Sequence, residues 1–325
     1  MFKSLSLLLK KTDVSQKRIG NYLLPPGIDI FERGWLSANN IFLFGNDDVS
    51  LVDTGYCAHQ QMTVDLVSNA LKQYGLKSLN KVLNTHLHSD HCGGNAALSE
   101  VFNCEILIPE AEAIAVQDWD ENLLSFRQLG QDCPRFAYQA LLVPGEEVVL
   151  GPYRWQILAA PGHHNHSVML YQEEHQILIS ADALWEEGFG VIFPELWGET
   201  GFEEVAQTLE LIEKLPVSLV IPGHGKPFAD VKKAIGIAKS RLDYLSSNPE
   251  SNARHGAKVL LKYKLLEWRS QEIVKVNQWI AATPALESIR KNINLPAEDF
   301  QGWLVEALLK SKAATIDKNC LVNQD

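Results

Sequence analysis

The chain lacks any hydrophobic run long enough to cross a membrane. None of its apolar stretches reaches the roughly 18 residues that mark a transmembrane helix. The N-terminal segment MFKSLSLLLKK has an apolar part of only residues 5–9, and no small-residue cleavage site follows it. We therefore expect a cytoplasmic protein without a membrane partner.

Cysteine and positive charge are both scarce. The five cysteines are an odd number without C-x-x-C spacing, which predicts reduced thiols and no disulfide framework. Lysine and arginine number 29 against 40 aspartates and glutamates, so the net charge of −11 argues against a general nucleic-acid binder. Hydrophobic residues nevertheless make up 46% of the 325 residues, enough to bury a substantial core.

The charge is unevenly distributed along the chain. From Asp230 onward 15 lysines and arginines face 11 aspartates and glutamates, a net charge of +4, whereas the preceding residues carry −15. Strand-like and helical patterns alternate before this point, and helical patterns dominate after it. We predict a larger domain over residues 1–229 and a smaller, mostly helical domain over residues 230–325.

Short apolar runs and helical spacing of apolar residues predict the elements. Strands are expected at 41–44, 49–52, 82–83, 106–108, 155–158, 168–171, 177–179 and 217–221. Helices are expected around 62–71, 96–101 and 205–212, and later at 234–245, 259–266, 273–280 and 296–309. Residues 313–316 and 320–322 could form a two-stranded wing. The alternation of strands and helices predicts a layered sheet-and-helix architecture.

Seven histidine and aspartate side chains each follow closely after a predicted strand. They are His86, His88, Asp90, His91, His163, Asp182 and His224. Imidazole and carboxylate are the ligands of zinc and similar metals. Seven ligands are too many for one tetrahedral ion but suit two ions that share a carboxylate, an arrangement used in metal-assisted hydrolysis.

The spacing of the first ligands supports this interpretation. His86 and His88 are two residues apart, so in an extended or turning segment both side chains can reach one ion. Asp90 and His91 come where a helix begins, and their side chains can diverge toward a second ion. Rigid strand ends then hold the remaining ligands, as a metal site requires.

In this order the residues resemble the signature of the metallo-β-lactamase superfamily, over roughly residues 28–228. The resemblance implies an α+β fold, an αββα sandwich, here followed by a helical, winged-helix-like extension. It implies two divalent metal ions. Zinc is the expected metal, and iron and manganese are alternatives. By the family pattern His86, His88 and His163 would hold one ion, and Asp90, His91 and His224 would hold the other. Asp182 would bridge the two ions. Asp53 would contact the ligands and not the ions. His224 in the last position is similar to the glyoxalase II, lactonase and ribonuclease-like groups.

The resemblance leads us to expect a dinuclear metal-dependent hydrolase. A metal-bridging hydroxide, oriented by Asp90, would attack a small carboxylic ester, thioester or lactone. A metal-dependent nuclease or phosphodiesterase is one alternative, but no basic-aromatic interleaving of the kind that stacks bases is present. A non-haem iron oxidoreductase of the same fold is another. The expected partner is a small-molecule substrate, with a second copy of the chain as a candidate dimer partner.

Residues beside the ligands predict the substrate pocket. Loops after metal-bearing strands usually line a pocket, so Trp185, Phe189 and Phe193 are expected in an apolar cleft wall. His164 and His166 flank the loop after His163 and either point into the cleft or only form hydrogen bonds. His166 is therefore a candidate substrate contact. The remaining isolated histidines, His59, His175 and His255, are interpreted as ordinary polar residues.

Overall fold

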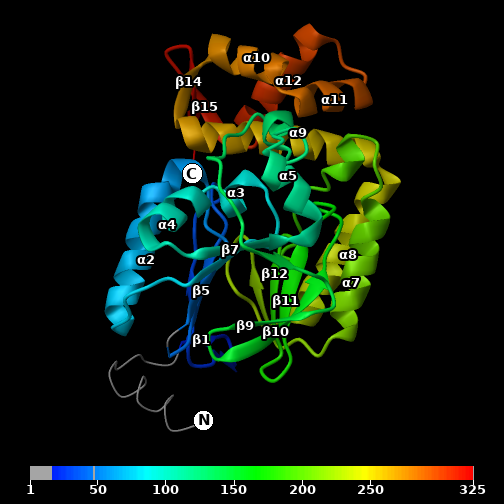
Figure 1. Cartoon of the computed structure of the whole chain (residues 1–325). Helices are drawn as coiled ribbons and strands as arrows, with labels where there is room; N and C mark the ends of the chain where they lie inside the picture. Colours follow the sequence, from blue (N-terminus) through cyan, green and yellow to red (C-terminus); the bar gives the residue numbers. More distant parts are fainter. Residues whose placement is uncertain (1–16, 47, 325) are drawn as a thin grey trace.

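Two β-sheets lie face to face in the computed structural model, which describes residues 17–46 and 48–324 (Figure 1). The first sheet has the order β3 (Ile28–Phe31), β4 (Asn40–Phe44), β5 (Val49–Val52), β6 (Lys81–Leu83), β7 (Glu105–Pro109) and β8 (Ala140–Leu142). The second has the order β13 (Leu219–Pro222), β12 (Ile177–Ala181), β11 (Val168–Gln172), β10 (Tyr153–Ala159) and β9 (Glu147–Leu150). The N-terminal segment MFKSLSLLLKK lies outside the described residues.

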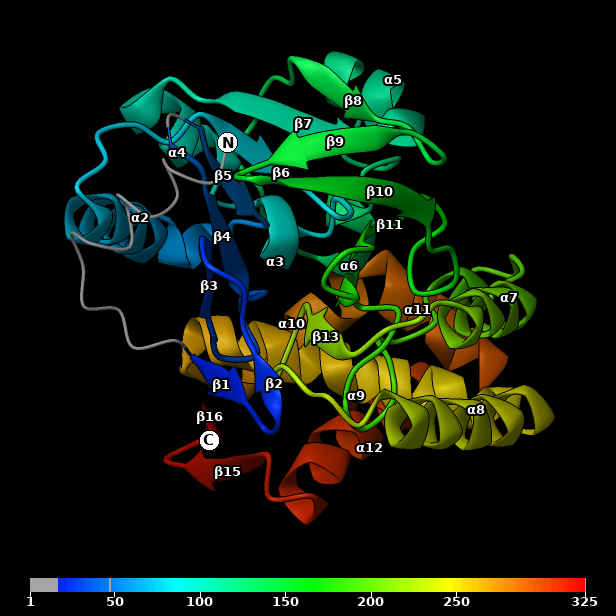
Figure 2. The ribbon, with the colours of Figure 1, turned by 90° about the horizontal axis from the view of Figure 1, so that it is seen from below.

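Helices cover the outer face of each sheet, so the predicted αββα fold is confirmed (Figure 2). Beside the first sheet lie α2 (Gln60–Tyr74), α4 (Asn95–Phe102) and α5 (Ala113–Asp118), and α3 (Ser89–Cys92) follows β6. The short helix α6 (Phe126–Leu129) instead contacts the C-terminal helix over residues 284–292. Beside the second lie α7 (Phe202–Lys214) and α8 (Val231–Ser247). Shorter pieces are β1 (Arg18–Ile19), β2 (Tyr22–Leu23), and the 3₁₀ turns η1 (Cys57–His59), η2 (Glu110–Glu112) and η3 (Pro194–Leu196).

Alternation along the strands explains why both faces of each sheet are buried. In β4, Ile41 and Leu43 point between the sheets, whereas Phe42 and Phe44 pack under the helices of the first sheet. Strand β12 repeats the pattern, with Ile179 facing the other sheet. A strand with apolar residues on both faces is therefore typical of a sheet that is covered on both sides.

Strand directions gather the predicted ligands at one edge. Strands β5 and β6 are parallel, as are β12 and β13, and β10 runs in the direction of β12 because two antiparallel pairings separate them. The carboxyl ends of β5, β6, β10, β12 and β13 lead directly into the segments that carry Asp53, His86, His163, Asp182 and His224. Carboxyl ends of open sheets are the usual place for ligand sites.

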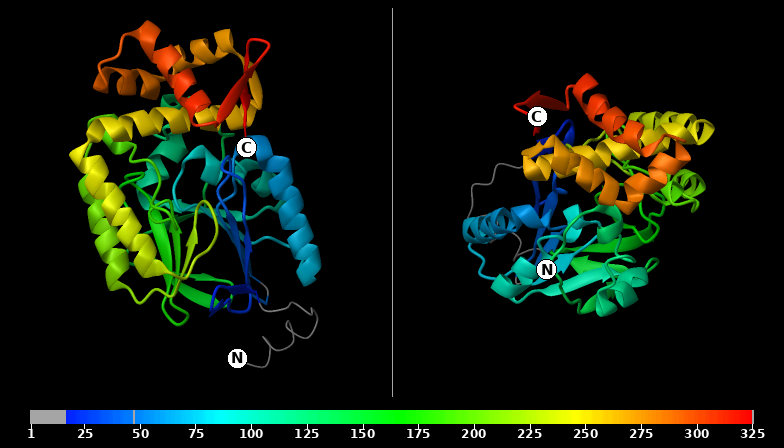
Figure 3. Two further views of the ribbon diagram at one scale, coloured as in Figure 1. Left: turned by 180° about the vertical axis from the view of Figure 1, so that it is seen from behind. Right: turned by 90° about the horizontal axis from the view of Figure 1, so that it is seen from above.

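The C-terminal helices cover this same end of the sandwich (Figures 1 and 3). They are α9 (Pro249–Trp268), α10 (Ile273–Ala282), α11 (Pro284–Asn292) and α12 (Ala297–Lys310), with β14 (Ser270–Glu272), β15 (Ala314–Asp317) and β16 (Cys320–Asn323). They share a separate apolar core, to which the loop after β12 contributes Val191, Phe193 and Leu196. Within the described residues no helix is both long and apolar enough to span a membrane.

Several elements differ from the sequence expectations. Helix α11 and strands β3, β8 and β9 were not predicted, and β13 begins at Leu219, two residues later than expected. The expected hairpin is present as β15 and β16, and β14 adds a third strand to it. Helix α8 packs with α7 on the sandwich although it follows residue 229. The division at residues 1–229 and 230–325, and the winged-helix-like comparison, therefore stay predictions.

Candidate metal centre

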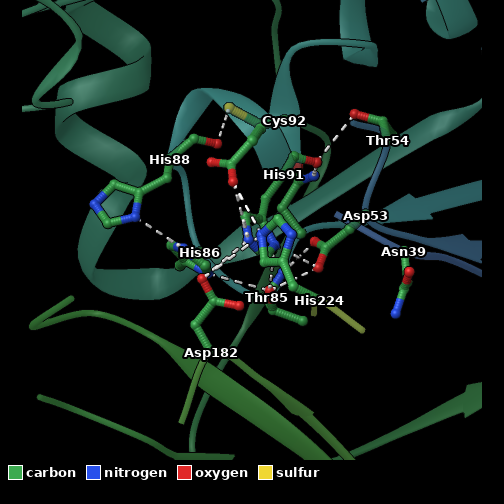
Figure 4. A network of polar contacts seen from close by, with 12 residues as sticks. Asn39, Asp53, Thr54, Thr85, His86, His88, His91, Cys92, Asp182 and His224 are labelled. Carbon is green, nitrogen blue, oxygen red and sulfur yellow. Dashed lines mark hydrogen bonds and ion pairs between the residues drawn. The ribbon is translucent and has the colours of Figure 1, made fainter. Parts of the chain in front are cut away.

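The buried carboxylate of Asp53 accepts hydrogen bonds that position neighbouring residues of the site. Asp53 accepts hydrogen bonds from the backbone N–H of Thr85 at 2.9 Å and from its hydroxyl at 2.8 Å. Its Oδ2 also lies 2.8 Å from Nδ1 of His91 (Figure 4). The carboxylate therefore holds the Nδ1 hydrogen of His91 and turns Nε2 toward the other predicted ligands.

Three imidazoles face one another on one side of the site. Nδ1 of His88 lies 3.0 Å from Nε2 of His86 and 2.8 Å from Nε2 of His163. The other nitrogen of His163, Nδ1, donates to the carbonyl of Val191 at 2.6 Å. The neutral form of His163 therefore presents a lone pair, not a hydrogen, to His88.

Asp182 lies between these imidazoles and the remaining predicted ligands. Its Oδ2 is 3.2 Å from Nε2 of His163, 3.4 Å from Nε2 of His91 and 4.0 Å from Nε2 of His224. Oδ1 instead accepts from the indole of Trp185 at 3.2 Å. The indole of Trp185 thus fixes Oδ1, and Oδ2 points toward the imidazoles.

Asp90 and His224 complete the far side. Oδ2 of Asp90 lies 3.1 Å from Nε2 of His224 and 3.9 Å from Nε2 of His91. Gly223 precedes His224, and a Cβ at this glycine would clash with Oδ1 of Asp182. Only glycine therefore allows the chain to bring His224 this close to Asp182.

The side chains fit divalent metal ions. Ligand atoms lie within 4.8 Å of one another in three overlapping groups, namely His86–His88–His163, His86–His91–Asp182 and Asp90–His91–His224. Nε2 of His91 is buried and has no hydrogen-bond partner among the described residues. Lone pairs that converge in a buried space need a cation between them, and imidazole with carboxylate is a donor set that suits zinc.

Burial and charge set the ionisation of these groups. Burial, followed by the neighbouring imidazoles, holds the pKa of His86 and of His88 well below the usual value. Burial also lowers the pKa of His163. For His91 burial acts in the same direction, but the carboxylates of Asp53, Asp182 and Asp90 together raise its pKa well above the usual value. Metals bind the neutral imidazole, so an ion at Nε2 of His91 would release the proton that these carboxylates favour.

A cavity of about 680 Å³ opens onto this cluster. Its inner end is formed by His88, Asp90, His163, Asp182 and His224. Its walls come from the loop after β12 and from α8, α9 and α12. The C-terminal helices thus form part of the wall of the space in which a substrate would meet the metal centre.

The predicted pocket residues divide into two groups. Trp185 and Phe193 line the cavity, and Phe193 also packs against His88 with ring centroids 5.3 Å apart. Phe189 does not line it, because the turn between Trp185 and Gly188 directs its side chain into the core beneath Arg241. His166 is also outside the cavity wall, since its Nδ1 lies 2.9 Å from the buried carboxylate of Glu112.

Other cavity residues were missed in the sequence. Trp35 stacks on His224 with ring centroids 5.6 Å apart, and its side chain comes from the loop between β3 and β4. Tyr263, Arg241 and His255 reach the cavity from α8 and α9. No motif marks these residues, because each is brought to the site only by tertiary packing.

The fold and this site together define a metal-dependent hydrolase. Residues 33–224, more than half of the chain, match the family described as "Metallo-beta-lactamase superfamily", and the chain belongs to that superfamily.

Curated relatives have related names. "Probable metallo-hydrolase MJ0888" of Methanocaldococcus jannaschii is 25% identical over 204 residues, which cover 58% of this chain and 88% of the relative. "Hydroxyacylglutathione hydrolase" of Bdellovibrio bacteriovorus is 27% identical over 140 residues, 43% of this chain and 46% of the relative. "Acyl-coenzyme A thioesterase MBLAC2" of Gallus gallus is 28% identical over 185 residues, 52% of this chain and 61% of the relative. The chain thus spans only 46% of this hydroxyacylglutathione hydrolase and 61% of this acyl-coenzyme A thioesterase.

Solved structures share the fold. The metallo-beta-lactamase family protein TTHA1429 from Thermus thermophilus superposes with a TM-score of 0.54 at 20% identity, covering 92% of this chain and 99% of the other. The BLEG-1 B3 metallo-beta-lactamase superposes with a TM-score of 0.52 at 21% identity, covering 64% and 96%. At these identities the likeness concerns the fold alone.

Proposed function

We propose that the chain binds two zinc ions and hydrolyses a small thioester, with carboxylic esters and lactones as related substrates. One observation carries the proposal: seven imidazole and carboxylate side chains converge at the inner end of a cavity with an aromatic wall. Relatives named as a hydroxyacylglutathione hydrolase and an acyl-coenzyme A thioesterase favour a thioester.

The ligand assignment follows the geometry. His86, His88 and His163 would hold one ion, Asp90, His91 and His224 would hold the other, and Asp182, which faces both sets, would be shared between them. When bound, the two ions would supply a water of lowered pKa and polarise the scissile carbonyl.

The protein's own groups then have distinct tasks. Asp90, whose Oδ2 faces His224 at 3.1 Å, would orient the attacking water and accept its proton. The carbonyl of Val191 and the carboxylate of Asp53 would keep the tautomers of His163 and His91 that leave Nε2 free. Trp35, Trp185 and Phe193 would exclude bulk water from the reacting bond.

A substrate panel tests the proposal. The zinc-loaded protein would be assayed with an acyl thioester, a p-nitrophenyl ester, a lactone and bis(p-nitrophenyl) phosphate, with Asp90→Asn as the control for metal-site chemistry. We expect the largest kcat/KM with the thioester and a loss of at least about 100-fold in Asp90→Asn. Turnover of the phosphodiester alone would replace the proposal with a phosphodiesterase.

A further inference from the structure

Three cationic side chains in the cavity wall have no acidic partner. Arg241 of α8, Lys258 of α9 and Lys226 of the loop after β13 all line the cavity. None of them forms an ion pair with a carboxylate anywhere in residues 17–46 and 48–324. Lys262 also lines the cavity, but its ammonium group donates to the carbonyl of Ala313 at 2.9 Å and to other acceptors.

The guanidinium of Arg241 is held in a fixed position. Nη1 donates to the carbonyl of Phe189 at 2.9 Å, and Nη2 lies 3.1 Å from Nε2 of His255. The group also lies over the ring of Phe189, with 4.9 Å from Cζ to the ring centroid. Two donor atoms are thus engaged by neutral groups, and the positive charge has no counter-charge within the described part of the protein.

His255 does not supply a negative charge, and it adds a donor. Burial, together with the charges of Arg241 and Lys258, lowers the pKa of His255 to about 4, so the ring is neutral at neutral pH. Because Nε2 accepts from Arg241, the hydrogen of the neutral ring is on Nδ1.

The acidic groups of the cavity do not neutralise these cations. Asp90 and Asp182 are engaged by imidazoles at the metal centre. Glu186 and Glu187 line the cavity but are exposed in the loop after Trp185, and neither pairs with Arg241, Lys258 or Lys226. In a protein of net charge −11, uncompensated cations around one cavity favour an anionic ligand there.

We propose that Arg241, Lys258 and Lys226 form an anion subsite that binds a carboxylate or phosphate on the thiol half of the substrate. The inference rests on the proposed thioesterase function and gives it a substrate class, an acyl thioester of an anionic thiol. Arg241 supplies the fixed fork for the anion, and the two lysines add charge from exposed or half-buried positions. The scissile bond would lie at the metal centre, whose residues line the same cavity.

Three thioesters with a common acetyl group separate the sources of the anion. S-acetylpantetheine is neutral, S-acetyl-4′-phosphopantetheine adds a phosphate to the same thiol, and S-acetylglutathione carries carboxylates. The measured quantity is the ratio of kcat/KM for each charged substrate to that for the neutral one. We expect this ratio to exceed one in the wild type and to fall as ionic strength rises.

Lys258→Ala and Arg241→Gln should each lower that ratio about 10-fold or more, mainly through KM. Arg241→Lys keeps the positive charge but not the planar fork, so it should lower the ratio less than Arg241→Gln does. Lys232→Ala is the matched control, because Lys232 is an exposed cation of α8 outside the cavity, and the ratio should stay unchanged.

The outcomes separate the two proposals. A wild type that hydrolyses none of the three substrates contradicts the thioesterase function. Hydrolysis of all three without a preference for either anion, or an unchanged ratio in Lys258→Ala and Arg241→Gln, overturns the subsite alone. If Arg241→Gln does not fold, Lys258→Ala and Lys258→Glu test the subsite, since the side chain of Lys258 makes no hydrogen bond or ion pair within the described chain.

Discussion

Asp53 and His91 form a buried hydrogen bond in which Oδ2 of the carboxylate lies 2.8 Å from Nδ1 of the imidazole. The side chains of both residues are almost completely buried, at 3% and 0% exposed. Asp53 itself has a φ of 57°, a left-handed conformation that non-glycine residues seldom adopt. The backbone at the end of β5 thus has an unfavourable conformation at the residue that orients His91, a predicted metal ligand.

This relationship predicts the effect of Asp53→Asn. An amide at this position can donate to Nδ1 of His91, which would move the hydrogen of the neutral ring to Nε2 and block metal binding there. We expect metal affinity to fall about 10- to 100-fold, as measured by competition with a chromophoric chelator. Asp48→Asn, which removes a partly exposed partner of Lys81, is the control and should not change the affinity.

The candidate ligands could be predicted from the sequence because they come in the segments that follow strands, and Asp90 and His91 come where the first helix after β6 begins. A strand end fixes both the position and the direction of the next side chain, so local pattern and tertiary position coincide at His86, Asp182 and His224. Their predicted roles as ligands stay predictions, although the structure brings all seven side chains together.

The walls of the cavity could not be predicted in the same way. Phe189 and Trp185 are four residues apart, yet the intervening turn sends one ring to the core and the other to the cavity. Arg241 and Tyr263 are on helices whose sequence shows which residues are apolar but not which end of the sandwich they cover. Such contacts depend on how distant elements pack, and no local pattern records that packing.

Elemental analysis should find two metal ions per chain after expression with zinc. Three overlapping ligand groups offer more donors than one four-coordinate ion can use. Stepwise removal by a chelator should release the second ion with loss of activity. One ion per chain with full activity would rule out the dinuclear centre.

Asp182→Ala should lower kcat/KM far more than His166→Ala. Oδ2 of Asp182 faces His163, His91 and His224, so its removal should disturb both ions. His166 contacts Glu112 outside the cavity, and we expect a loss of less than about 10-fold for it. Steady-state kinetics at saturating zinc measure both, and equal losses would show that His166 belongs to the catalytic centre.

The pair of His166 and Glu112 predicts a pH dependence of stability. The hydrogen bond to Glu112 raises the pKa of His166 above its usual value. A raised pKa in the folded state means that the stabilisation is complete below the unfolded pKa of roughly 6.5. It disappears as the pH rises through the folded pKa.

The free energy of unfolding in urea would be compared between wild type and His166→Gln at pH 6 and pH 9. Because the side chain is 46% exposed, we expect a difference of no more than about 1 kcal/mol at pH 6 and less at pH 9. A difference that grows toward pH 9 would contradict the sign of this argument.

The C-terminal helices should control access of the substrate without carrying the chemistry. All seven candidate ligands precede Asp230, whereas α9 supplies Tyr263, Leu260 and Leu266 to the cavity wall. A chain that ends at Ser247 keeps α8 on the sandwich, and one that ends at Lys226 also loses α8 and its apolar contacts with α7. Both should bind metal, because the ligand set is intact.

Both truncated chains should also expose apolar surface, which favours aggregation, and the shorter one more so. For the chain ending at Ser247 we expect a changed ranking of the substrate panel, since one wall of the cavity is gone. Metal content, sedimentation and kcat/KM on every substrate measure these effects. If this chain remains monodisperse and its kinetics are unchanged throughout, the C-terminal helices form an independent module, and a role in binding another macromolecule replaces the role in substrate access.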